Sequence, residues 1–129
     1  MIKITDIAFT GYPVTDMSAA RHFYESILGL TPEIYPLEAG KSWVEYTLPS
    51  GTLAISNIDP NWKPTGNGVS IGLEVADMTE TLSFLKEHGL KVCLEPFETP
   101  VCTIAGIADP DGNPITLHKK KACHPDCQS

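Results

Sequence analysis

The sequence has few cysteines, few basic residues and no long apolar run, and each shortage excludes a class of protein. Four cysteines in 129 residues are too few for a disulfide scaffold, so free thiols are expected. Nine Lys and Arg against 16 Asp and Glu give a formal charge of −7. Nucleic acid is therefore not an expected partner, because binding a phosphate backbone requires clustered cations. The one basic run, residues 119–121, is interpreted as solvated chain.

The chain also starts without the apolar stretch of a signal peptide or a membrane span. Its first residues alternate between apolar and polar types after a single lysine. This pattern predicts a cytoplasmic protein with no membrane partner. The length suits one domain, and 42% apolar with 19% charged residues is a composition that folds.

A segment of about sixty residues occurs twice. Residues 14–17 (VTDM) recur as residues 75–78 (VADM), 61 positions later. The same offset relates Phe23 to Phe84 and Gly51 to Gly112. Gly29 and Gly89, where the two predicted helices end, are only 60 apart, so the second helix is one residue shorter.

Each copy is predicted to contain a strand, a helix and three further strands. Alternating or β-branched runs predict opening strands over residues 4–14 and 69–75. Asp16 or Thr15, and Asp77, suit a helix N-cap, while a glycine suits the left-handed residue after each helix. The later strands are expected near residues 33–35, 43–48 and 52–57 in the first copy, and 91–95, 103–108 and 114–118 in the second.

These boundaries predict one domain over residues 1–121. It comprises a first module (2–57), a linker (58–68) rich in proline and glycine, and a second module (69–119). Residues 122–129 are predicted to be a mobile tail. Two cysteines and a histidine in that tail, Cys123, His124 and Cys127, could ligate a metal, but they are a poor match to the four-ligand spacings of structural zinc, and an unstructured tail is the favoured interpretation.

This module order resembles the vicinal-oxygen-chelate superfamily, which includes glyoxalases, bleomycin-resistance proteins and dioxygenases. The resemblance is carried by the VTDM segment, by Ile27-Leu28-Gly29-Leu30 at the helix end, and by residues 109–115 (DPDGNPI). It covers residues 2 to about 119. It implies an α+β fold in which two βαβββ modules place curved mixed sheets around a cleft with helices outside, in a protein that usually forms homodimers.

The resemblance also implies four metal positions, which in metal-using members carry His, Glu or Gln. Counting seven residues back from each capping Asp gives Phe9 and Ser70. The DPDGNPI segment gives Thr116, and the 61-residue offset then gives Ile55. None of these side chains is a strong ligand, so neither a metal nor another cofactor is expected.

Alternation along the strands predicts the other residues of the ligand-binding cleft. Those expected on the same faces as the four positions are Gly11, Asn57, Gly72, Glu74 and His118. The two glycines would admit a ligand near the backbone or allow tight packing. Glu74 and His118 are the only candidates for acid–base catalysis, the alternative being solvated strand ends. Trp43, Glu45, Tyr46 and Trp62 are candidates for cleft walls, core or a dimer contact.

Three functions fit this sequence. The first is metal-independent binding of a small molecule, as in bleomycin-resistance proteins. The second is an enzyme of the lactoylglutathione lyase, epimerase or dioxygenase kind with atypical metal ligands. The third is a non-catalytic module whose cleft is filled by its own side chains. Fold alone does not separate them.

Overall fold

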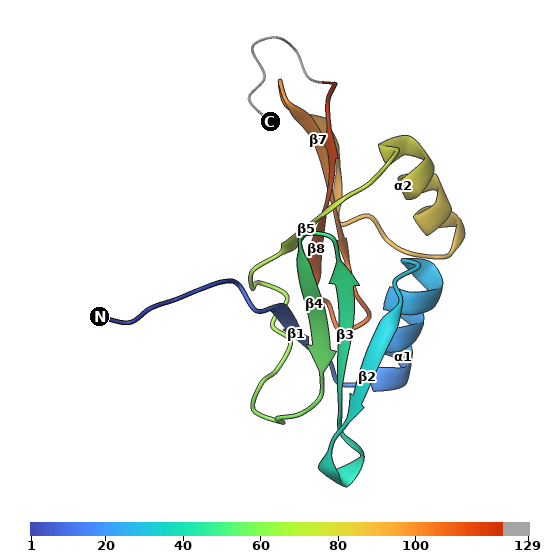
Figure 1. Ribbon diagram of the computed structural model, residues 1–129. Coiled ribbons are helices and arrows are strands. Elements are labelled where there is room, and N and C mark those ends of the chain that lie inside the picture. Colours follow the sequence, from blue (N-terminus) through green and yellow to red (C-terminus); the bar gives the residue numbers. More distant parts are fainter. Residues whose placement is uncertain (123–129) are drawn as a thin grey trace. The chain divides into compact units, whose positions relative to one another are not determined.

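The computed structural model describes residues 1–122, and the chain divides into two compact units (Figure 1). The first unit is Met1–Thr65 and the second begins at Gly66. Each unit contains one four-stranded mixed sheet and one helical segment. From residue 123 on, the predicted tail lies outside the described residues, and so does the alternative of a metal site at Cys123 and Cys127.

The first unit has the predicted order of elements. Its sheet order is β1-β4-β3-β2, with β1 parallel to β4 and the other neighbours antiparallel. The elements are β1 (Thr10–Pro13), α1 (Met17–Arg21), a π-helical continuation η1 (His22–Ile27), β2 (Pro32–Pro36), a short 3₁₀ turn η2 (Glu38–Gly40), β3 (Ser42–Leu48) and β4 (Gly51–Ser56).

The second unit repeats this topology with sheet order β5-β8-β7-β6. Here β5 is parallel to β8, and the other neighbours are antiparallel. The elements are β5 (Ile71–Glu74), α2 (Met78–Glu87), β6 (Leu94–Glu98), β7 (Cys102–Ala108) and β8 (Pro114–Lys120). The predicted fold class, α+β with two βαβββ modules, is confirmed.

The predicted helix caps are present in both units. Asp16 Oδ1 accepts a hydrogen bond from the Ala19 N–H at 3.0 Å, and Asp77 Oδ1 accepts one from the Glu80 N–H at 2.8 Å. Gly29 and Gly89 follow the helices with φ of 75° and 79°, a conformation that side chains with a Cβ rarely adopt.

The extra residue of the first helical segment is accommodated by a π-helical turn. The Leu28 N–H donates to the Phe23 carbonyl five residues earlier, at 2.9 Å, whereas α2 has regular α-helical geometry. One additional residue within an otherwise equivalent segment explains why Gly29 and Gly89 are 60 rather than 61 apart.

One face of each sheet packs under the helical segment of its own unit. In the first unit this face carries Tyr12, Ile55 and Val44 in one row and Leu53 beside Tyr46 in the next. In the second unit, α2 packs against β8. The buried apolar residues on this side of the second unit, from α2, β7 and β8, are Met78, Leu82, Leu85, Ala105, Ile107, Ile115 and Leu117. Burial of these apolar rows is the main source of stability in each module.

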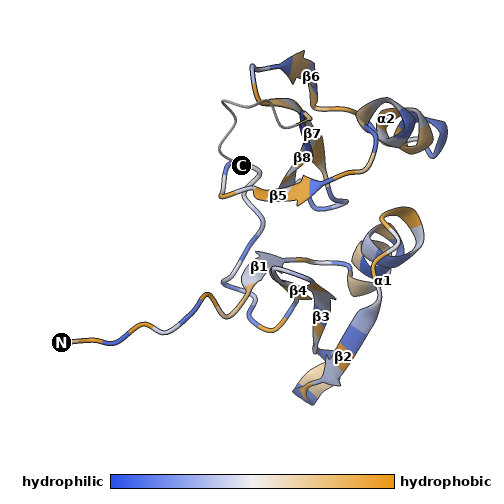
Figure 2. Ribbon diagram, turned by 45° about the horizontal axis from the view of Figure 1, so that its top comes forward, coloured by the Kyte–Doolittle hydropathy of each residue, from blue (hydrophilic) through white to orange (hydrophobic). Residues whose placement is uncertain are grey.

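Two predicted strand boundaries are wrong. The opening strand was expected over residues 4–14, but β1 covers only Thr10–Pro13: its pairing with β4 begins at Thr10 with Leu53, and residues 4–9 have no paired strand in the described part of the chain. Ile4 and Ile7 are consequently 85% and 83% exposed, and Figure 2 shows the alternating hydropathy of this segment. The strand expected at residues 91–95 is β6, which starts three residues later at Leu94.

A partly buried polar network joins the first helical segment to its sheet. The Arg21 guanidinium donates to both carboxylate oxygens of Glu25 at 2.7 and 3.0 Å, and the Tyr46 hydroxyl donates to Glu25 Oε2 at 2.9 Å. Arg21, followed by the Tyr46 hydroxyl, holds the pKa of Glu25 below its usual range. Burial and the adjacent carboxylate raise the pKa of Tyr46. The network fixes the helical segment above β3.

Glu25→Gln is expected to lower the free energy of unfolding by about 1 kcal/mol at neutral pH, because the charge-assisted bonds to Arg21 weaken. Since the folded-state pKa of Glu25 lies below its unfolded-state value of about 4.3, this stabilisation is complete above that value. It is lost as the pH falls through the folded-state pKa. Urea denaturation at several pH values should show wild type and variant converging in acid.

The exposed Glu87→Gln variant is the control for this pH dependence, and it should follow wild type throughout. A difference between wild type and Glu25→Gln that stayed constant into strong acid would contradict the assigned network.

Candidate functional site

The face of the second sheet opposite α2 carries small and polar residues. Direct pairing places Gly72, Thr116 and Gly106 in one row across β5, β8 and β7. The hydroxyls of Ser70 and Thr116 are 2.7 Å apart and hydrogen bond to each other. A Cβ at Gly72 would meet no described atom within 4 Å, whereas one at Gly106 would lie 2.9 Å from Leu94 Cβ. Gly72 therefore leaves space at the backbone, while Gly106 is required by packing.

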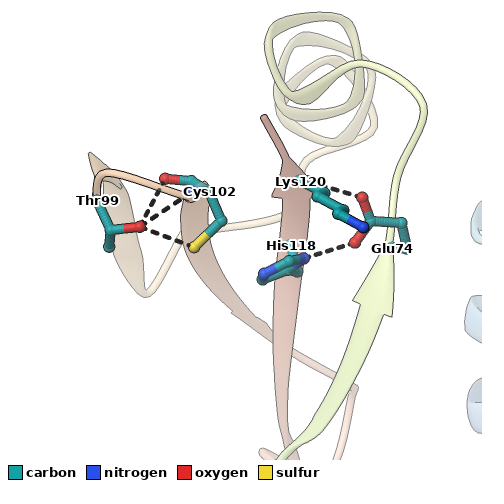
Figure 3. A network of polar contacts seen from close by, with 5 residues as sticks. All are labelled: Glu74, Thr99, Cys102, His118 and Lys120. Carbon is teal, nitrogen blue, oxygen red and sulfur yellow. Dashed lines mark hydrogen bonds and ion pairs between the residues drawn. The ribbon is translucent and has the colours of Figure 1, made fainter. Parts of the chain in front are cut away.

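The next row on this face contains an acid–base pair. Glu74 pairs directly with His118, and His118 Nδ1 lies 2.5 Å from Glu74 Oε1 (Figure 3). The Lys120 backbone N–H donates to Glu74 Oε2 at 2.7 Å. That backbone bond, and then the bond to His118, hold the pKa of Glu74 below its usual range. The structure thus brings together the two residues that the sequence could only place separately on one face.

The expectation that Ile55 shares a face with Phe9 and Gly11 is wrong. Gly11 pairs with Ala54, and Ile55 pairs with Tyr12 on the helix-facing side, where it is fully buried. Equivalent pairs in the two hairpins are Glu45 with Ala54, nine residues apart, and Gly106 with Thr116, ten residues apart. The second hairpin thus contains one more residue, and the offset beyond its turn becomes 62. The counterpart of Thr116 is therefore Ala54. A shift of one residue moves a strand side chain to the opposite face.

The corresponding face of the first sheet carries an aromatic cluster, which we define as Phe9, Trp43 and Trp62. The rings of Phe9 and Trp43 meet edge to face with centroids 4.9 Å apart. A Cβ at Gly11 would lie 3.1 Å from the Phe9 ring and 3.2 Å from the Trp62 ring. The missing side chain of Gly11 thus allows these two rings to pack close to the backbone, and it does not leave an open space for a ligand. Trp43 Nε1 donates to Glu45 Oε2 at 2.8 Å, which orients the indole on this face.

Asn57, a predicted cleft residue, and Cys102 both have local structural partners. Asn57 follows β4, and its Oδ1 accepts a hydrogen bond from the Ser42 N–H at 2.9 Å. Cys102 is buried, with its Sγ 3.1 Å from the Thr99 hydroxyl (Figure 3). Neither residue is paired with a base in the contacts that the structure gives.

The described side chains do not fit a metal ion at the four positions predicted from the resemblance, with Ala54 in place of Ile55. Phe9 and Ala54 have no donor atom, and the hydroxyls of Ser70 and Thr116 satisfy each other. Within residues 1–122 no group of three or more His, Cys, Asp or Glu side chains is placed to hold a metal. Glu74 and His118 supply two donors and are already bonded together.

Within residues 1–122 no helix is long and apolar enough to cross a membrane.

Two βαβββ modules, each with one helix-covered sheet face and one face of small, polar and aromatic residues, define the glyoxalase type of architecture. The chain belongs to the Glyoxalase/Bleomycin resistance protein/Dioxygenase superfamily, whose family model matches residues 6–117. The predicted resemblance is thereby confirmed. A search of curated proteins returned no match.

Solved structures support the same assignment. TnmS3, an antibiotic binding protein from Streptomyces sp. CB03234, is 26% identical, with a TM-score of 0.77 over 94% of this chain and 100% of that one. A glyoxalase/bleomycin resistance protein from the same organism is 28% identical, with a TM-score of 0.71 over 87% and 98%. A related domain from Frankia sp. EAN1pec shares the fold at 16% identity, with a TM-score of 0.73 over 95% and 96%. Small-molecule binding is thus supported at the level of the family.

Sequence reasoning did not identify two parts of these faces. Trp43 and Trp62 were recognised as candidates, but their grouping with Phe9 around Gly11 depends on the path of the chain after β4. Ile104 and Phe97, which continue the row of Glu74 and His118 across β7 and β6, were not singled out. Alternation within each strand was a usable signal, but the register between strands was needed to align them.

Proposed function

We propose that the protein binds a small molecule without the help of a metal ion, on a sheet face that no helix covers. In the first unit this face carries the aromatic cluster, and in the second unit it carries the Glu74–His118 row. The observation that carries this proposal is the chemistry of the family's metal positions. Two of them are hydrocarbon, and the other two are hydroxyls that bond to each other at 2.7 Å. Such positions contact a ligand by packing and neutral hydrogen bonds, which is typical of small-molecule pockets.

The similarity to TnmS3, whose description is an antibiotic binding protein, supports the same class of function. The aromatic cluster adds a physical reason. Phe9 remains 44% exposed although its ring packs on Trp43. Exposed aromatic surface is available for a ligand to cover, and planar ligands gain from contact with such rings.

The proposal predicts a protein that is free of metal and stabilised by a ligand. Protein purified without chelators should contain well under one transition-metal ion per chain by elemental analysis. A thermal-shift screen across diverse antibiotics should find a compound that raises the free energy of unfolding by about 2.7 kcal/mol at a hundred times its dissociation constant.

Tryptophan fluorescence provides a second readout, because both tryptophans of the chain lie in the first unit. A ligand that covers the aromatic cluster should quench emission in wild type and quench it less in Trp43→Phe. Stoichiometric nickel, zinc or iron whose removal abolished binding or turnover would refute metal independence. A screen with no stabilising compound would favour the filled, non-binding module instead.

A further inference from the structure

A single row of residues crosses all four strands of the second sheet. The register pairs Glu74 on β5 with His118 on β8, His118 with Ile104 on β7, and Ile104 with Phe97 on β6. Directly paired residues project from the same face of a sheet. The row spans roughly 14 Å, at about 4.8 Å per strand. It changes from a carboxylate and an imidazole at one end to apolar side chains at the other, and Phe97 is 45% exposed.

The contacts of Glu74 determine which nitrogen of His118 carries the proton. Glu74 accepts the Lys120 backbone N–H, and its pKa lies below the usual range, so it is a carboxylate at neutral pH. A carboxylate only accepts hydrogen bonds, and His118 Nδ1 must therefore donate. In the neutral ring, Nε2 is then an acceptor. Nε2 points away from Glu74 (Figure 3), and it has no hydrogen-bond partner among the described residues.

Few other titratable groups lie around this row. Lys120 follows on β8, and Cys102, which pairs with Lys120 from β7, bonds the Thr99 hydroxyl. Lys119 acts on Glu74 through its charge. The neighbouring row of Gly72, Thr116, Gly106 and Leu94 contains no titratable side chain. In the neutral ring, His118 Nε2 is therefore a hydrogen-bond acceptor beside an apolar strip, and Gly72 leaves the adjacent backbone uncovered.

We propose that this row binds a small molecule with a weakly acidic hydroxyl, a phenol or an enol, and takes its proton. The apolar part of the ligand lies over Ile104 and Phe97, and its hydroxyl meets His118 Nε2. The O–H bond breaks, the proton forms a new N–H bond at Nε2, and the electron pair stays on the ligand oxygen. The resulting imidazolium is stabilised by the Glu74 carboxylate. This inference rests on the proposed small-molecule binding and specifies the class of ligand.

Partial exposure sets the scale of the effect. The side chains of His118 and Glu74 are 37% and 54% exposed, so water competes for the same hydrogen bonds. We therefore expect a preference for the hydroxylated ligand of about tenfold, the value of one charge-assisted hydrogen bond, rather than a preference of several thousandfold.

The probe is 4-nitrophenol, with its methyl ether 4-nitroanisole as the matched compound that lacks the acidic hydroxyl. Both are titrated into the full-length protein at several pH values around neutrality, with each compound in protein-free buffer as the reference for its own ionisation. Wild type is expected to bind 4-nitrophenol about tenfold more tightly than 4-nitroanisole and to raise the visible phenolate absorbance. His118→Gln is expected to abolish both effects, and Glu74→Gln to weaken them.

The matched control residue is His88, whose Nδ1 also faces an acceptor, the Phe84 carbonyl at 2.8 Å, but which has no carboxylate partner. His88→Gln should behave as wild type. Long-range ¹H–¹⁵N NMR should assign the neutral His118 ring as protonated at Nδ1, which tests the geometry without a ligand.

Equal affinity for the two compounds, no phenolate absorbance with wild type, or an Nε2-protonated neutral ring would each overturn this inference. The outcomes also separate it from the proposed function. A compound from the antibiotic screen that stabilises wild type and His118→Gln equally leaves small-molecule binding intact and removes the proton-accepting role. The absence of any stabilising compound removes both.

Discussion

Ile55→Ala is expected to lower the free energy of unfolding by about 2–5 kcal/mol, whereas Thr116→Ala should lower it by less than about 1 kcal/mol. Ile55 is fully buried between Tyr12 and Val44 on the helix-facing side of the first sheet, so truncation leaves a cavity. Thr116 loses only its bond to the exposed Ser70. Urea denaturation followed by far-ultraviolet circular dichroism measures both.

The comparison is informative because the 61-residue offset equates these two positions. If Ile55 lay on the same face as Phe9, as that offset predicts, the two truncations would have similar and small effects. A loss below about 1 kcal/mol for Ile55→Ala would therefore contradict the observed register. Ala54→Gly adds a control on the adjacent residue, which faces Gly11 and carries only a methyl group.

Asp109→Ala is expected to cost about 3 kcal/mol. Asp109 is buried at the turn before β8, where Oδ1 accepts the backbone N–H groups of Asp111 and Asn113, each at 2.9 Å. Oδ2 accepts the Asn113 side-chain amide at 2.8 Å, and Asn113 is itself buried. Removing the carboxylate takes a charge-assisted acceptor from three donors at once, and a buried donor without its acceptor is costly.

The corresponding turn of the first unit provides the control. Ser50 is exposed in the short connection between β3 and β4, and Ser50→Ala should change stability by less than about 0.5 kcal/mol. Asp109→Asn should cost less than Asp109→Ala, since its amide oxygen can still accept the backbone donors. The measurement is again chemical denaturation. Equal stability of Asp109→Ala and wild type would show that the turn does not depend on its aspartate.

Local patterns in the sequence were sufficient for most of the fold. The N-cap aspartates Asp16 and Asp77 and the glycines at 29 and 89 act through bonds and backbone angles within a few residues, so their positions could be predicted directly. The turn residue Gly112 also has a positive φ, of 85°, a conformation that suits glycine. Repetition of these signals identified two copies of one module.

The candidate site was less predictable, because it depends on register between distant strands. Glu74 and His118 are 44 residues apart, and alternation placed each on a face without showing that they touch. Ile55 was misplaced because one additional residue in the second turn changes the offset, and period-two geometry converts a single residue into a change of face. Gly11 could equally serve a ligand or internal packing until the rings of Phe9 and Trp62 were located.

Local signals and residue identity were sufficient to predict the two-module fold, the family and the non-ligand chemistry of Phe9, Ser70 and Thr116. The pairing of Glu74 with His118, the place of Ile55 in the core and the extension of the row by Ile104 and Phe97 became evident from the structure alone. Hydrogen bonding between strands sets which residues become neighbours. That pairing changes with every inserted residue, whereas capping and turn chemistry do not.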